Sequence, residues 1–277
     1  MLTLTSRTLR VALCLLLACA AAHAASPRAA ARAQTRPAKV PAPLARSRQL
    51  IVVTTPGWNS VQGTLRRFER AGAGGEWKQA GESFPVVVGR AGLGRGEGVV
   101  SMPEGFNLNK GTEGGPVKKE GDGRAPAGVF RLGPAFGFDG SDEAGWVRLP
   151  YKPLTPATEC VDDTASSHYN RIVERGKVGA IDWNSSERMR SVEGYRWGLV
   201  VLHNSPPVAG RGSCIFLHVW QGPDRGTAGC TAMEQTHLEA LLRWLDPRKR
   251  PLLVQLPEEE YARLRAGWRL PSTAGGK

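Results

Sequence analysis

A cysteine that follows a glycine, Cys230 in Thr227-Ala228-Gly229-Cys230, lies twelve residues after His218, which ends the apolar run 214–218. A thiol at the mouth of a turn between a strand and a helix has backbone N–H groups behind it that can receive a developing oxyanion. A histidine that ends a neighbouring strand can accept the thiol proton. The pattern predicts a thiol enzyme with Cys230 as nucleophile, His218 as base, and the N–H groups of Gly229 and Cys230 as oxyanion donors.

The same residues also allow a purely structural interpretation, in which Cys230 is a small buried hydrophobe and His218 a satisfied core histidine. His203 is the second candidate for the base, because it also ends an apolar strand, although Asn204-Ser205-Pro206-Pro207 after it is typical of a plain turn. A backbone carbonyl or a nearby hydroxyl, for which Ser213 is the candidate, would orient the second ring nitrogen of the base.

The N-terminus has the pattern of a secretory signal. Two arginines precede an apolar stretch, residues 11–22, that is too short to span a bilayer and ends in the small-x-small motif Ala22-His23-Ala24. We therefore expect residues 1–24 to be removed and the mature protein to be periplasmic or secreted. A lipoprotein signal at Leu16-Leu17-Ala18-Cys19 is less favoured, because leucine fits poorly before that alanine. No later segment reaches the roughly 20 apolar residues of a membrane span.

Export leaves an odd number of cysteines, Cys160, Cys214 and Cys230, in an oxidising compartment. One thiol must stay unpaired or pair between chains. A Cys160–Cys214 disulfide would leave Cys230 free, as a nucleophile requires, but the sequence leaves open which of the three is unpaired. No close Cys-x-x-Cys or His-x-x-x-His pair is present, so we expect neither a metal nor another cofactor.

Composition divides the mature chain into a tail and one domain. Residues 25–48 are rich in Ala, Pro and Arg with few large apolar side chains, which predicts a flexible tether. Eight of the +12 net charges lie in the signal and this tether, so the domain, residues 49–271, is only weakly basic. This argues against nucleic-acid binding and favours contact of the tether with an anionic envelope surface. Residues 272–277 are expected to form a disordered tail.

The domain is predicted to be mainly β with helices near its end. Apolar and β-branched runs predict strands at 49–55, 61–69, 76–78, 85–89, 129–132, 199–203, 214–220 and 252–256. Leucines at helical spacing predict a helix over Glu234–Leu245, and three glutamates at 258–260 open a final short helix. The segment 151–198 is predicted to be an insertion over the active-site cleft, as a structural cover or a specificity lid, with a helix at Ser186–Val192.

The glycine turn at residues 120–130, the strand that ends in His218, and the segment Thr227-Ala228-Gly229-Cys230 resemble the L,D-transpeptidase (YkuD-type) catalytic domain. The resemblance implies a mainly β, sandwich-like fold. It also implies His218 as general base, Gly229 and Cys230 as the motif's glycine and nucleophile, and substrate contacts at Thr227, with Ser213 a further candidate. Two departures indicate a divergent branch, because alanines occupy 228 and 232, where the family usually has histidine and arginine.

The implied reaction is attack of the Cys230 thiolate on the third residue of a peptidoglycan stem peptide, at its L-centre. D-alanine leaves and a thioester remains on the cysteine. Transfer to an amine is L,D-transpeptidation, in cell-wall remodelling and cell shape; transfer to water makes the protein an L,D-carboxypeptidase or stem-peptide hydrolase. A wall-binding module without catalysis is the third alternative. The resemblance implies peptidoglycan stem peptides as partners and no cofactor.

Overall fold

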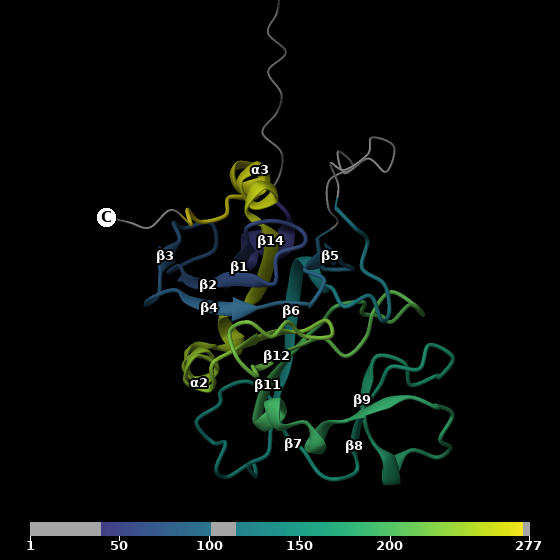
Figure 1. Ribbon diagram of the computed structural model, residues 1–277. Helices are drawn as coiled ribbons and strands as arrows, with labels where there is room; N and C mark the ends of the chain where they lie inside the picture. The colour runs from purple at the N-terminus through teal and green to yellow at the C-terminus, as the bar shows by residue number, and fades with distance from the viewer. Residues whose placement is uncertain (1–39, 101–114, 274–277) are drawn as a thin grey trace, which may run out of the picture. The chain divides into compact units, whose positions relative to one another are not determined.

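The computed structural model describes residues 40–100 and 115–273 (Figure 1). The predicted signal at 1–24, residues 25–39 of the predicted tether and residues 274–277 of the predicted tail lie outside the described residues. None of the described helices has the length and the apolar character that crossing a membrane would require.

The structure is mainly β, as predicted, and its largest sheet closes on itself. The strands that hydrogen-bond in turn around it are β1 (Gln49–Thr55), β14 (Leu252–Pro257), β6 (Ala125–Gly137), β11 (Trp197–Val201), β12 (Phe216–Val219), β13 (Thr231–Met233), β4 (Phe84–Val87) and β2 (Gln62–Glu69). β1 pairs with β14 on one edge and with β2 on the other. The implied two-sheet sandwich is therefore replaced by a barrel-like arrangement, because pairing at both edges of β1 leaves no free edge between two sheets.

Short strands and helices extend this barrel. β3 (Lys78–Gln79), β5 (Leu93–Arg95) and β7 (Tyr151–Pro153) pair with its strands, and β8 (Thr158–Val161), β9 (Arg171–Glu174) and β10 (Ser186–Arg188) form a separate three-stranded sheet. The helices are α1 (Ala42–Arg46), α2 (Gln235–Trp244) and α3 (Glu258–Trp268), with 3-10 turns η1 (Arg175–Lys177), η2 (Met189–Ser191), η3 (Glu193–Arg196) and η4 (Pro247–Lys249). The two helices predicted near the C-terminus are thus present.

The barrel core is built from the apolar faces of these strands and helices. β1 and β14 are buried along their whole length, and α3 packs against both of them. Leu238, Leu241 and Leu242 of α2, which carried the helical spacing in the sequence, are fully buried in the same cluster. The periodicity that predicted this helix therefore marks the face that it buries.

The predicted flexible tether extends too far toward the domain, because residues 40–48 belong to the folded structure. Leu44 of α1 is buried in the core. The guanidinium group of Arg70 donates to the backbone oxygens of Leu44 at 2.6 Å and Ser47 at 2.8 Å. The composition of this segment favoured a tether because Arg70, the residue that anchors it, lies more than twenty residues away along the chain.

The segment 151–198 forms a second layer on the outer face of β12. Leu217 points into the barrel core, whereas Phe216 packs with Met189 and Tyr195 in a separate apolar cluster. The predicted helix at Ser186–Val192 is wrong, because β10 pairs with β8 and is followed by the turn η2. The short run has no helical periodicity strong enough to compete with that strand pairing.

Candidate active site

Cys230 lies directly before β13, beside Phe216 of β12. These strands are parallel, with Leu217 opposite Thr231, so Phe216 is level with Cys230. The Phe216 N–H donates to the Cys230 Sγ at 3.2 Å, and the thiol donates to the carbonyl oxygen of Cys214 at 3.4 Å. Backbone groups on both sides therefore fix the sulfur, whose residue is only 7% exposed.

His218 lies on the same face of the sheet as Cys230. Side chains alternate along a strand, so Phe216 and His218 share one face of β12, and parallel pairing places Cys230 on that face as well. The His218 Nδ1 lies 2.8 Å from the carbonyl oxygen of Val219. That carbonyl only accepts, so Nδ1 carries the proton and Nε2 is the basic nitrogen. Within residues 40–100 and 115–273, no hydrogen bond joins His218 to Cys230.

Burial determines the protonation states of Cys230 and His218. It raises the pKa of the Cys230 thiol well above its usual range; the nearby Glu187 carboxylate raises it further, while the Phe216 N–H and Lys118 oppose the shift. Burial also lowers the pKa of His218 to about 4, against a smaller opposite effect of its bond to Val219. The resting pair is therefore a neutral thiol and a neutral imidazole.

A cavity of about 170 Å³ opens beside Cys230, and its wall carries charges of both signs. It is lined by Arg90, Lys118, Glu120, Gly121, Asp162, Glu187, Ser213, Cys214, Ile215, Ala228, Gly229 and Cys230. Asp162 and Glu187 come from the segment 151–198. That segment therefore contributes one wall of the cavity as well as covering the sheet.

Tyr195 connects His218 to this wall. Its ring meets the His218 ring edge-on, with centroids 5.3 Å apart and planes at 78°. Its hydroxyl donates to the Glu187 carboxylate at 2.7 Å. Burial raises the pKa of Glu187, and the bond from Tyr195 opposes that shift. Sequence reasoning missed both residues, because they come from a segment whose sequence shows no periodicity that would place them near the motif.

Hydrogen bonds within the motif connect Thr227 with Gly229 and Cys230. The Thr227 hydroxyl donates to the carbonyl oxygen of Cys230 at 2.6 Å and accepts the Gly229 N–H at 3.2 Å. The Gly229 N–H, predicted as an oxyanion donor, is thus already bound. The hydroxyl of Thr227, for which substrate contact was predicted, has two partners inside the loop and fixes the loop's shape.

Ser213 and His203, the other two candidates from the sequence, form hydrogen bonds elsewhere. The Ser213 hydroxyl lies in the cavity wall and donates to Glu120 at 2.8 Å, so it does not orient His218. His203 is 2% exposed, and neither His203 nor His218 lines the cavity. Its Nε2 lies 2.9 Å from the carbonyl oxygen of Arg211. His218 shares the strand face of Cys230, whereas His203 lies beyond the end of β11 and packs edge-on against Phe130.

The disulfide fixes the second layer to the site. Cys160 of β8 is bonded to Cys214, with Cα atoms 6.0 Å apart, and Cys230 is the free cysteine of the described residues. Of the pairings that the sequence left open, this is the one that leaves the candidate nucleophile unpaired. It holds β8 next to the carbonyl group that accepts the Cys230 thiol.

Comparison with known proteins identifies the family of the domain. The family model of the L,D-transpeptidase catalytic domain (YkuD) matches residues 75–254, a range that includes His218 and Cys230. Neither a curated protein nor a solved structure matches the chain.

Proposed function

Since the chain belongs to the L,D-transpeptidase catalytic-domain family, we propose that it is a cysteine L,D-transpeptidase that acts on the stem peptides of peptidoglycan. The observation that carries the proposal is the free thiol of Cys230 on the same face as His218, at the wall of a cavity. We further propose that the protein works outside the cytoplasm in cell-wall remodelling, as the signal pattern at residues 1–24 suggests.

Proton transfer would accompany attack, because both groups are neutral at rest. The thiol leaves its hydrogen bond to the Cys214 carbonyl, and the His218 Nε2 takes its proton as the sulfur attacks the donor carbonyl carbon. The bond from Nδ1 to Val219 holds the ring in place and stabilises the imidazolium that forms. When the tetrahedral intermediate collapses, His218 returns the proton to the leaving amine and a thioester remains on Cys230.

The cavity wall supports a peptide substrate. Arg90 in this wall suits carboxylate groups, whereas Lys118 is already paired with Asp122 at 2.7 Å. The acidic side chains of the wall, Glu120, Asp162 and Glu187, suit ammonium groups. A stem peptide carries both kinds of group. An incoming amine would then attack the thioester and complete transpeptidation.

Hydrolysis is the second candidate, and one observation favours it. The cavity beside Cys230 is small, about 170 Å³, and the residue itself is 7% exposed, so water reaches the thioester more easily than a bulky amine. A wall-binding module without catalysis is the third, and it requires a thiol that does not react.

The experiment uses two readouts on the purified chain. A carbapenem, which acylates the cysteine of this family, should label Cys230, as measured by intact mass and peptide mapping. Incubation with purified sacculi should then give new L,D-crosslinks among the muropeptides. Shortened stems without new crosslinks would assign the hydrolase instead, and an unreactive thiol would leave only the wall-binding module.

A further inference from the structure

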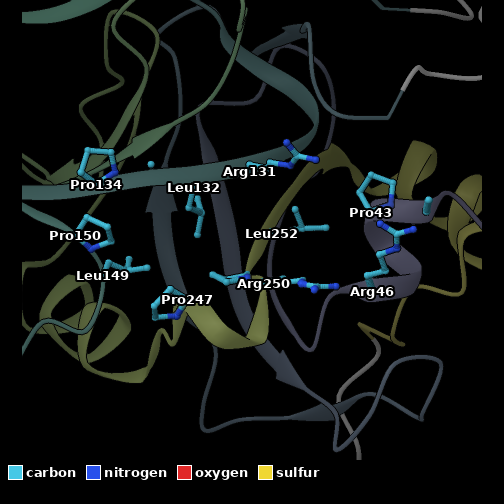
Figure 2. Close-up of a pocket in the computed structure, with 13 residues that line it drawn as sticks. Pro43, Arg46, Arg131, Leu132, Pro134, Leu149, Pro150, Pro247, Arg250 and Leu252 are labelled. Carbon is cyan, nitrogen blue, oxygen red and sulfur yellow. The ribbon is translucent and has the colours of Figure 1, made fainter.

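A second cavity, of about 670 Å³, lies between α1, β6 and the chain at residues 247–252 (Figure 2). It shares no lining residue with the cavity beside Cys230. Its volume falls within the roughly 300–1,000 Å³ of small-molecule sites in proteins. The peptidoglycan activity proposed above does not involve this cavity. The residues that line it therefore indicate which ligand fits it.

One end of the cavity is apolar. Figure 2 shows Pro134, Leu149, Pro150 and Pro247 together at this end. Leu132 and Leu252 lie in the middle of the view, between that end and α1. Such a wall offers contacts to a hydrocarbon body and few hydrogen bonds to a polar one.

The other end is cationic. Arg46 ends α1, Arg131 lies in β6 opposite Leu252, and Arg250 lies two residues before β14 with a φ of 52°. All three side chains are exposed, and their guanidinium groups lie toward the α1 side of the cavity in Figure 2. None of the three forms an ion pair with another residue of the described ranges.

These three arginines are suited to bind an anion. Three like charges around one opening repel one another, and a phosphate or carboxylate between them would relieve that repulsion. Guanidinium groups bind such anions through paired, charge-assisted hydrogen bonds. The chain's own N-terminal segment is a poor occupant, because residues 25–39 contain four basic side chains and no acidic one.

We propose that this cavity binds an anionic lipid, with the headgroup phosphate on Arg46, Arg131 and Arg250 and the first part of an acyl chain along Leu132 and Leu252 toward the prolines. The two ends of the cavity match the two ends of such a molecule. The site would hold the folded domain at a membrane surface, with the Cys230 cavity lined by other residues and left open. It is independent of the peptidoglycan activity proposed above.

Binding of alkyl phosphates to the purified chain tests the proposal by calorimetry. Decyl phosphate, below its micelle concentration, should bind with a saturable one-to-one isotherm. Affinity should rise from hexyl to decyl phosphate by up to about fourfold per methylene group, until the apolar end is filled. Decanol should bind roughly tenfold or more weakly, because it lacks the charge. Inorganic phosphate should show no saturable binding.

Variants separate this site from general basic attraction. Arg131→Gln with Arg250→Gln should weaken decyl phosphate binding by roughly tenfold or more. Arg171→Gln, which removes an exposed arginine from β9, should bind like the wild type. In sedimentation with phosphatidylglycerol vesicles, Arg171→Gln should bind like the wild type and the double variant should bind more weakly. Carbapenem labelling of Cys230 should be equal in all these chains, which also shows that they are folded.

Four results would overturn the proposal. Equal affinity of the wild type for decyl phosphate and decanol would show that the arginines do not bind the phosphate. Equal affinity of the double variant and the wild type for decyl phosphate would show this as well. Tighter binding of a tetraglutamate peptide than of decyl phosphate would assign the cavity to acidic peptides. A dimer that forms at the calorimetric concentration and disappears in the double variant would assign this face to a second copy of the chain.

Discussion

The Cys230 sulfur accepts the N–H of Phe216 at 3.2 Å, two residues before His218 on the same strand face. One short strand therefore supplies both a hydrogen bond to the sulfur and the histidine proposed to accept its proton. The register of β12 and β13 therefore sets the backbone positions from which the thiol and this histidine extend.

The first prediction concerns the nucleophile. Cys230→Ser should abolish acylation by a carbapenem, because a serine hydroxyl is a far poorer nucleophile than a thiolate. The smaller oxygen fits the buried position, so the midpoint of thermal unfolding should change little. Intact mass after incubation with the carbapenem measures the label. Labelling of this variant to the wild-type level would contradict the thiol mechanism.

The second prediction concerns the disulfide, which closes a loop with a sequence separation of 54 residues. Its loss in Cys160→Ser with Cys214→Ser should lower the free energy of unfolding by about 4 kcal/mol. Urea denaturation measures this difference. The acylation rate should fall as well, because β8 and the wall residue Asp162 lose their anchor. Unchanged unfolding and acylation would show that the second layer holds its place without the bond.

Cys230 and His218 could be predicted from the sequence because strand, turn and cysteine are close along the chain. Tyr195 and Glu187 could not, because strand pairing with β8 and the disulfide place them there, and neither leaves a periodic pattern. The closed barrel was missed for a related reason: β1 and β14 pair although about two hundred residues separate them.

The third prediction concerns Glu187, whose carboxylate raises the pKa of the Cys230 thiol. Glu187→Gln removes that negative charge, so the pKa of the thiol should fall. Alkylation by iodoacetamide should then become faster at a given pH, with the midpoint of its pH profile shifted downward. Glu193→Gln, an exposed carboxylate of η3, is the matched control and should leave the profile in place. An unshifted profile in Glu187→Gln would contradict the electrostatic contact.

The fourth prediction concerns Tyr195 as a positioning residue for His218. Tyr195→Phe keeps the ring contact and should retain most of the acylation rate. Tyr195→Leu removes the edge-on aromatic contact with the His218 ring and should slow acylation by roughly tenfold or more, since small misplacement of a base is costly. Rates and unfolding midpoints of both variants should be measured together. Equal rates in the two variants would show that the ring does not orient the histidine.

The fifth prediction decides between the two histidines. The neutral imidazole is the acting base, and burial lowers the pKa of His218 to about 4, so the wild-type acylation rate should be nearly constant from pH 6 to 8. It should fall as pH drops through about 4, where His218 becomes protonated. Burial lowers the pKa of His203 to about 4 as well, so the wild-type profile excludes an exposed histidine as base, and only the variants distinguish His218 from His203.

The variants complete this comparison. His218→Gln should slow acylation by roughly 100-fold or more, the scale for a positioned base, and should remove the fall near pH 4. His203→Gln should keep the rate and the profile and should act through stability, because His203 is buried against Phe130 and bound to Arg211. Stopped-flow acylation and thermal unfolding measure the two effects separately. If His203→Gln is inactive while folded and His218→Gln keeps the wild-type profile, the base lies on the other strand.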